Sequence, residues 1–241
     1  YVFQDARLFE HLTVLGNLEY AIRRRSSANN AATIDEVVET LQIGPLLSRM
    51  PQTLSAGQKQ RVAVARALLR SPVMLLMDEP LANLDHAAKQ SILPALHHVS
   101  ARWNIPIIFV SHDIEEVSQL ADYLVLLENG AVILHGPALE LSSKLDTRLS
   151  HEEQAAAIVT GVVAAHDDTF SLTQISADDQ MIFVSRLSLP IGEPCRVRIP
   201  ARDISLCRTR PTDSSILNVM AVTVAEIEQT HEPRILLRLT M

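Results

Sequence analysis

The chain has 241 residues, of which 47% are hydrophobic and 20% are charged, and its formal net charge is -7 at pH 7. This length predicts two domains, and the apolar content excludes an intrinsically disordered chain. The acidic balance argues against nucleic acid as a partner, because phosphate binding needs clustered Lys and Arg. The basic run Arg23-Arg24-Arg25 is interpreted as a solvated helix end.

The cysteines and the apolar runs indicate the cellular compartment of the protein. Cys195 and Cys207 have neither C-x-x-C nor metal-ligand spacing, which is typical of a reducing cytoplasm. No apolar run approaches the ~18 residues of a membrane-spanning helix, and no signal peptide is evident. Because the chain begins at Tyr1 inside an apolar run and ends at Met241 in a strand pattern, we expect it to be cut from a longer protein.

Residues 1–136 alternate short apolar runs with helix-period stretches. This pattern is typical of an α/β unit with a largely parallel sheet. Strands buried on both faces are expected at 73–77 and 107–110. Helices are expected at 34–47, 58–69 and 87–103.

A polar linker is expected at 137–153, and a small all-β domain follows it at 154–241. Turn signals such as Asp178-Asp179 separate short alternating strands, which favours a barrel. The expected strands cover residues 158–164, 181–186, 195–199, 218–227 and 234–239.

Two adjacent acids, Asp78 and Glu79, follow the first buried strand. They therefore lie at the carboxyl edge of the sheet, where open α/β folds bind ligands. Adjacent side chains on an extended chain point different ways, so one acid can hold a magnesium ion while the other faces an attacking water. The alternative is a helix N-cap followed by Pro80.

The stretch Leu54-Ser55-Ala56-Gly57-Gln58 opens the helix at 58–69. A helix N-terminus offers unpaired N–H groups and a partial positive charge to a phosphate. Ser55 adds a hydroxyl group, and Gly57 allows close approach of the backbone. The alternative is a plain N-cap, in which Ser55 accepts a hydrogen bond from the Gln58 amide.

Further polar residues follow strands or turns. His112 comes after the second strand, where it can donate a hydrogen bond to a phosphate or to a water-activating acid. The alternative for such a lone histidine is a structural role. Gln4 follows the apolar run that opens the chain, and a turn at 83–85 ends in Asp85.

The order of these features identifies a family. The sequence resembles that of ABC ATPases, in which a Q-loop, a signature motif, a Walker B motif, a D-loop and a switch histidine follow one another. The matching features here are, in the same order, Gln4, the Ser-x-Gly-Gln helix start, a strand ending in Asp-Glu, Leu-Ala-Asn-Leu-Asp and a strand ending in His. The resemblance covers residues 1–136. It implies an ABC-type P-loop NTPase core, with a helical subdomain at about 5–70 and the segment from Walker B to the switch histidine at 73–112.

The resemblance also implies the cofactors, ATP and Mg²⁺, and a role for each residue. Asp78 organises the metal ion and Gln4 senses it, Glu79 is the general base, and His112 holds the γ-phosphate. Other residues contact ATP that is bound mainly by the opposite subunit of a head-to-tail homodimer. These are Ser55, Ala56, Gly57, Gln58 and Asp85.

The sequence departs from the family pattern in several places. Ala56 replaces the usual first glycine of the signature, and Ala82-Asn83 varies the D-loop; we expect both changes to be tolerated. No G-x-x-x-x-G-K-[ST] loop is present, although backbone amides and the lysine of that loop hold the phosphates. We therefore expect the intact parent protein to be an ATPase and this chain alone to be inactive.

The interval between Gln4 and Ser55 is short. ABC ATPases of DNA repair insert long coiled coils or zinc modules there, whereas importers have one compact helical subdomain. In importers this subdomain and the Q-loop receive a helix of the membrane permease, and a substrate-binding protein acts indirectly. The resemblance thus implies a peripheral protein at the cytoplasmic face of the cell membrane.

The β domain is similar to the Mop/TOBE-type module of some importer ATPases. Residues 1–9, 199–206 and 214–218 resemble the molybdate importers in particular. Ser215 and Asn218 are candidate oxyanion ligands, because hydroxyl and amide groups can hydrogen-bond an oxyanion without a full counter-charge. The alternative is a turn that enters a strand, and Leu217 stands where relatives often carry a basic residue. Two alternative functions remain. The protein is either the ATPase of an importer for sulfate, polyamine or iron, or a catalytically silent adaptor.

Overall fold

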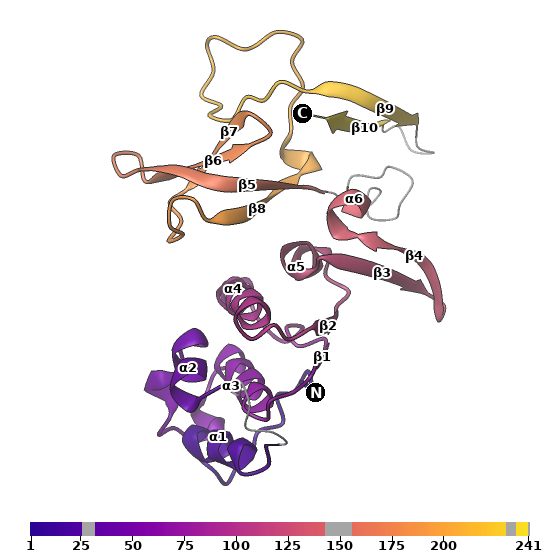
Figure 1. Ribbon diagram of the computed structural model, residues 1–241. Helices are drawn as coiled ribbons and strands as arrows, with labels where there is room; N and C mark the ends of the chain where they lie inside the picture. The colour runs from indigo at the N-terminus through magenta and orange to yellow at the C-terminus, as the bar shows by residue number, and fades with distance from the viewer. Residues whose placement is uncertain (26–31, 143–155, 230–234, 241) are drawn as a thin grey trace. The chain divides into compact units, whose positions relative to one another are not determined.

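The computed structural model describes residues 1–25, 32–142, 156–229 and 235–240. The chain divides into two compact units, Tyr1–Leu120 and Ala121–Met241, whose elements are labelled in Figure 1. Residues 121–136 therefore lie in the second compact unit, whereas the sequence placed them with the ATPase core. The expected domain limits stay a prediction.

Five helices and two short 3₁₀ turns dominate the described part of the first unit (Figure 1). They are α1 (Val14–Ile22), α2 (Ile34–Thr40), η1 (Gly44–Leu46), η2 (Pro51–Thr53), α3 (Ala56–Leu68), α4 (His86–Trp103) and α5 (Ile114–Leu120). The first four helices begin at polar N-caps, Thr13, Thr33, Ser55 and Asp85, whose side chains accept an N–H of the first turn. Such caps satisfy amides that the helix itself leaves unpaired.

The prediction of one helix over 34–47 is wrong, because α2 ends at Thr40. Gln42 takes a left-handed φ of 53°, and a separate 3₁₀ turn that contains Pro45 begins at Gly44. Proline lacks an N–H donor and disfavours helical geometry in the residue before it. The arginine run is confirmed as a helix end: Arg23 pairs with Glu19 at 3.5 Å, just beyond α1.

Strands β1 (Leu75–Asp78) and β2 (Ile107–Val110) pair in parallel, with Asp78 opposite Val110. This confirms the parallel arrangement. The prediction that both faces are buried is wrong, because Ile108 and Val110 are about half exposed. Ile107 packs on the helical core instead, so helices cover one face of this small sheet.

The second unit is built mainly of antiparallel strands. A hairpin of β3 (Tyr123–Glu128) and β4 (Ala131–Pro137) leads into α6 (Ala138–Ser142). A four-stranded sheet follows in the order β7-β6-β5-β8. Its strands are β5 (Ala156–Asp167), β6 (Leu172–Ala177), β7 (Gln180–Ser185) and β8 (Pro194–Pro200). After η3 (Ala201–Asp203), β9 (Thr223–Gln229) pairs with β10 (Ile235–Thr240).

Most of the expected strands of this unit are present, and Asp178-Asp179 forms the expected turn, with positive φ at both residues. The strand expected at 218–227 begins only at Thr223, because side chains bind the preceding segment to β7 in place of a backbone ladder. Gln180, for example, donates from its amide to the Ala221 carbonyl at 2.9 Å. Within the described residues none of the sheets closes into a barrel, and most of the linker expected at 137–153 lies outside them.

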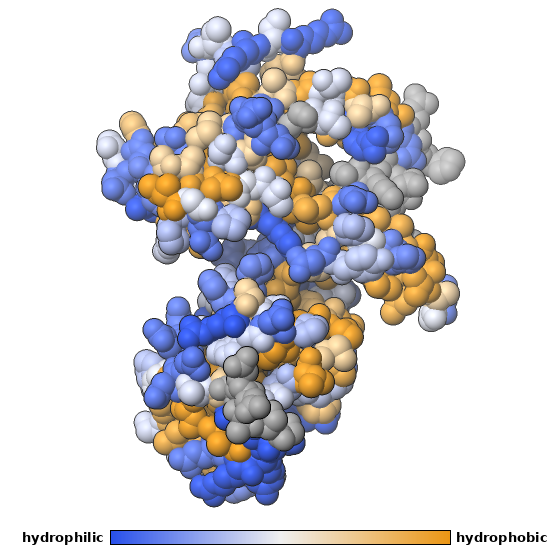
Figure 2. Space-filling model, viewed as in Figure 1, coloured by the Kyte–Doolittle hydropathy of each residue, from blue (hydrophilic) through white to orange (hydrophobic). Residues whose placement is uncertain are grey.

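An apolar surface covers the β3–β4 hairpin and is orange in Figure 2. Val125, Leu127 and Val132 on these strands are all more than half exposed. None of the described helices combines the length and the apolarity needed to cross a bilayer.

Candidate functional site

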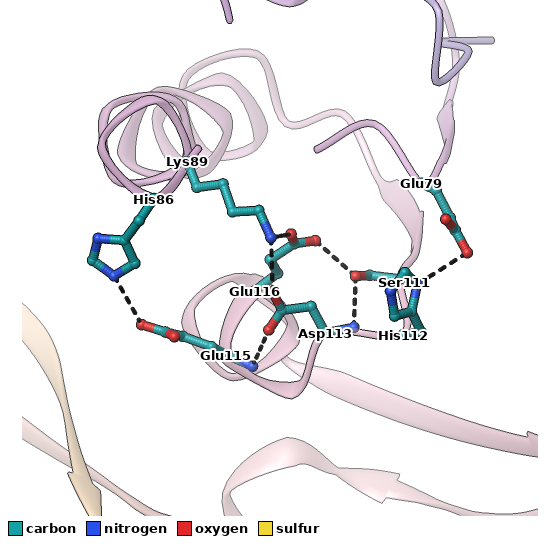
Figure 3. A network of polar contacts seen from close by, with 8 residues as sticks. All are labelled: Glu79, His86, Lys89, Ser111, His112, Asp113, Glu115 and Glu116. Carbon is teal, nitrogen blue, oxygen red and sulfur yellow. Dashed lines mark hydrogen bonds and ion pairs between the residues drawn. The ribbon is translucent and has the colours of Figure 1, made fainter. Parts of the chain in front are cut away.

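The carboxyl ends of β1 and β2 bring the acid pair and the histidine together. The Nδ1 atom of His112 lies 3.1 Å from Oε1 of Glu79 (Figure 3). A carboxylate can only accept a hydrogen bond, so Nδ1 is the nitrogen that carries the proton in this contact. The neighbouring Asp78 accepts a hydrogen bond from the Tyr1 hydroxyl at 2.8 Å, which raises the pKa of Tyr1. The two adjacent acids thus have different partners.

The backbone of Glu79 takes a left-handed conformation, with a φ of 42°. Its N–H donates to the Val110 carbonyl at 2.9 Å, and its carbonyl accepts from Ala82 at 3.3 Å. A non-glycine residue in this conformation is uncommon and costs free energy, and such residues cluster at functional sites. The neighbouring strand therefore holds Glu79 in a geometry that local preference alone would not select.

Ser55 forms the N-cap that the alternative interpretation predicted. Its Oγ accepts from the Gln58 amide at 3.3 Å, and the Gln58 side chain accepts from the Ser55 amide at 3.0 Å. This reciprocal capping box stabilises the start of α3. Ser55 and Ala56 are nevertheless exposed, so this helix start faces solvent.

Gly57 has a packing role that the sequence did not indicate. A Cβ atom on Gly57 would lie 3.1 Å from the Cβ of Ala88, which is tighter than ordinary van der Waals contact. The missing side chain therefore lets α3 approach α4 closely. Asp85 is the N-cap of α4, with its Oδ1 accepting from the Ala88 amide at 2.8 Å.

Gln4 lies at the edge of a hollow of about 90 Å³ that Ala56 and Asn83 also line. The structure thus brings together the segments that resemble the Q-loop, the signature motif and the D-loop. Two side chains of α3 fix the loop on either side of Gln4. Gln60 donates to the Phe3 carbonyl at 3.2 Å, and Arg66 donates to the Ala6 carbonyl at 3.1 Å.

Sequence reasoning missed both of these α3 residues. Gln60 is only 2% exposed, and burial lowers the pKa of Arg66. A polar residue on the buried side of a helix is the signal that could have found them, because buried polar groups need hydrogen-bond partners.

In the second unit the two oxyanion candidates differ in their surroundings. The side-chain amide of Asn218 donates to the Phe183 carbonyl at 2.8 Å and accepts from the Phe183 amide at 2.7 Å. Ser215 is exposed and lies in a turn where the Ser214 hydroxyl accepts from the Ile216 amide at 3.1 Å. These contacts favour the turn interpretation for this segment, and the oxyanion role stays a prediction.

The described residues contain no group of three His, Cys, Asp or Glu side chains arranged for a metal ion. Mg²⁺ needs less than that, because it commonly takes one or two carboxylates and completes its shell with water and phosphate oxygens. The exposed carboxylate of Asp78 at the end of β1 fits this requirement.

The ABC transporter family profile matches residues 1–82. The chain belongs to the ABC transporter ATPase family. It is 44% identical over 239 residues to the molybdenum import ATP-binding protein ModC of Aromatoleum aromaticum, covering 99% of this chain and 63% of that protein. Molybdenum import ATP-binding protein ModC 1 of Azotobacter vinelandii is 44% identical over 240 residues, covering 99% and 66%. The chain spans just under two thirds of the length of these relatives.

A solved structure of an ATP-binding cassette, in a dimeric post-hydrolysis state bound to ADP and Pi, is 28% identical to this chain. Its TM-score is 0.48, and the match covers 57% of this chain and 61% of that one.

Proposed function

We propose that this chain is part of the ATP-hydrolysing subunit of an ABC importer and that the imported substrate is molybdate. One observation carries the ATPase role: the Glu79–His112 contact of 3.1 Å at the carboxyl ends of two parallel strands. The substrate rests on the similarity to molybdenum import proteins, which extends over 99% of the chain. A catalytically silent adaptor would have no chemical need for this pair.

In the proposed mechanism Glu79 accepts the proton of the attacking water, a contribution typically worth ~10²–10⁴-fold in rate. His112 holds the Glu79 carboxylate through Nδ1 and has its second ring nitrogen free to face the γ-phosphate. Bound Mg²⁺ would neutralise charge on the phosphates, with Asp78 and Gln4 as its protein ligands. The exposed start of α3 would offer the N–H groups of Ala56 and Gly57, together with the Ser55 hydroxyl, to ATP held by a second copy in a head-to-tail homodimer.

The remaining parts of the proposal concern the assembly. The helical subdomain at about 5–70 and the Q-loop would receive the membrane permease at the cytoplasmic face of the membrane, with a substrate-binding protein acting indirectly. The second unit would be a Mop/TOBE-like barrel, and the limits 1–136, 137–153 and 154–241 would describe the domains. The phosphates of the subunit's own ATP would be held by a loop that precedes Tyr1, so the chain alone would be inactive.

The test expresses the native reading frame that contains this chain, with whatever precedes Tyr1, and measures phosphate release from Mg-ATP. Glu79→Gln should reduce turnover by at least ~10²-fold while leaving ATP binding intact. Glu39→Gln, an acid on α2, is the matched control and should leave turnover unchanged. Turnover that survives Glu79→Gln would contradict the assigned base, and robust hydrolysis by residues 1–241 alone would contradict the need for a preceding loop.

The substrate needs its own experiment. Uptake of molybdate and of sulfate is compared in cells with and without the gene, with Glu79→Gln as the inactive control. Loss of molybdate uptake alone supports the proposal, whereas loss of sulfate uptake alone would assign the other oxyanion.

A further inference from the structure

The two residues that flank His112 in the chain, Ser111 and Asp113, belong to a closed ring of hydrogen bonds and ion pairs (Figure 3). The ammonium group of Lys89, on α4, lies 2.8 Å from Oδ2 of Asp113 and 2.7 Å from Oε1 of Glu116. The other oxygen of Glu116 accepts from the Ser111 hydroxyl at 2.7 Å. Ser111 in turn accepts from the Asp113 amide at 3.0 Å. His112 therefore stands between two residues that both belong to the ring.

Burial makes the ring depend on Lys89. The side chain of Glu116 is only 3% exposed, and that of Lys89 is 22% exposed. Removal of the cation that pairs with a buried carboxylate strongly destabilises the folded protein, because it leaves an uncompensated buried charge. The hydrogen bonds to Asp113 and Glu116 raise the pKa of Lys89, so the lysine is charged at neutral pH.

The ring also stabilises the ionised form of Asp113. Burial of Asp113 opposes its ionisation, but the hydrogen bond from Lys89 and those from backbone amides outweigh this effect and lower the pKa of its carboxyl. The amide of Glu115 donates to Oδ1 of Asp113 at 2.9 Å. The other titratable pair facing the ring is His86 with Glu115, at 3.8 Å.

The ring joins two elements of the proposed ATPase site. Lys89 lies about one turn after Asp85, the N-cap of α4. Its two acidic partners lie at the start of α5 and just before it, directly after His112. A single cation thus ties the D-loop end of α4 to the segment that carries the switch histidine.

We propose that Lys89 is a positioning residue that holds His112 against Glu79 and couples its placement to the start of α4. The role of His112 in ATP hydrolysis is part of the proposed function, and the proposal rests on that function in this respect alone. The contact itself can be measured without ATP.

The test uses residues 1–241 with ¹⁵N-labelled histidine, at a mildly alkaline pH. NMR reports which nitrogen of His112 carries the proton. Lys89→Met should shift His112 from the Nδ1–H tautomer, which Glu79 favours, toward the Nε2–H tautomer of free imidazole. Amide exchange over 113–117 should rise by about tenfold or more because the local structure opens, while that of α3 should not change.

Two further variants separate positioning from a general loss of stability. Lys89→Arg should retain the wild-type tautomer, because a hollow of about 130 Å³ beside Lys89 can accept the larger side chain. Arg102→Met removes a different ion pair of α4, with Glu36 at 3.3 Å, and should leave His112 unchanged. If Lys89→Met does not fold, the double variant Lys89→Met/Glu116→Gln removes the unpaired buried charge and is measured in the same way.

The proposal is overturned if a folded Lys89→Met, or the double variant, keeps the wild-type tautomer and exchange. It is also overturned if Arg102→Met changes His112 as much as Lys89→Met does. A tautomer shift in Lys89→Met that Lys89→Arg does not show supports it. Failure of ATP hydrolysis in the native reading frame would remove the proposed function and leave this result standing, so the two failures are distinguishable.

Discussion

The Nδ1 atom of His112 contacts Oε1 of Glu79 at 3.1 Å although the two residues are 33 positions apart in the chain. The parallel register of β1 and β2, in which Asp78 lies opposite Val110, brings their carboxyl ends to the same edge. The His112 side chain is 77% exposed, so packing does not hold it in place. The hydrogen bond to Glu79 and the ring around Ser111 and Asp113 hold it instead.

The first prediction concerns this pair. His112→Ala should lower the rate of ATP hydrolysis by the native protein by ~10²-fold or more, because Glu79 loses the group that orients it. The KM for ATP should change less than kcat. His97→Ala, at an exposed histidine of α4, is the control. Equal losses in both variants would contradict a specific role for His112.

The second prediction concerns the packing of α3 on α4. Gly57→Ala should lower the free energy of unfolding by about 1 kcal/mol, because the new methyl group overpacks a contact with Ala88. The double variant Gly57→Ala/Ala88→Gly should be more stable than the sum of the two single effects predicts. Urea denaturation of the four proteins provides the measurement. Strict additivity would show that the two positions do not touch.

The third prediction concerns Asn17, which is fully buried in α1. Its side-chain amide donates to the Thr13 carbonyl at 2.9 Å, and its oxygen accepts from the Phe9 amide at 2.8 Å. Asn17→Leu leaves these groups unpaired and should cost about 2–4 kcal/mol, since each buried unsatisfied group costs about 1–3 kcal/mol. Asn83→Ala, at an exposed position, should change stability by less than ~0.5 kcal/mol. A loss below ~1 kcal/mol for Asn17→Leu would contradict this account.

The fourth prediction concerns pH. The pKa of Asp113 is lowered in the folded protein, so the stability that it contributes is present above its unfolded pKa of about 3.9 and is lost as the pH falls through the lower folded value. The pKa of Lys89 is raised, so its contribution is present below its unfolded value of about 10.4 and is lost as the pH rises through the higher folded value. Asp113→Asn should therefore flatten the acid limb of a plot of unfolding free energy against pH. An acid limb unchanged in this variant would exclude Asp113 as a source of the dependence.

The sequence by itself determined the features that depend on neighbouring residues. Ser55 and Asp85 cap helices because a side-chain oxygen reaches an amide two or three residues later, and this contact needs no tertiary structure. The apolar runs ending at Asp78-Glu79 and before His112 marked two strand ends, and parallel pairing was implied by the helix between them. The break at Pro45 was also present in the sequence but was not recognised, which made the helix at 34–47 too long.

Only the tertiary structure decided which side chains from different elements meet. Gln60 reaches the Phe3 carbonyl, Gly57 contacts Ala88, and Lys89 closes the ring around His112 because helices pack at particular distances and rotations. Hydrophobic periodicity indicates which face of a helix is buried, but it carries no information about the partner or the register. The exposure of Ile108 and Val110 shows the same limit, since an apolar strand has the same sequence pattern whether one of its faces is covered or both. Helix caps and turns depend on residues a few positions apart and can therefore be predicted from the sequence. A hydrogen bond between distant residues exists only after packing has brought its two atoms within reach.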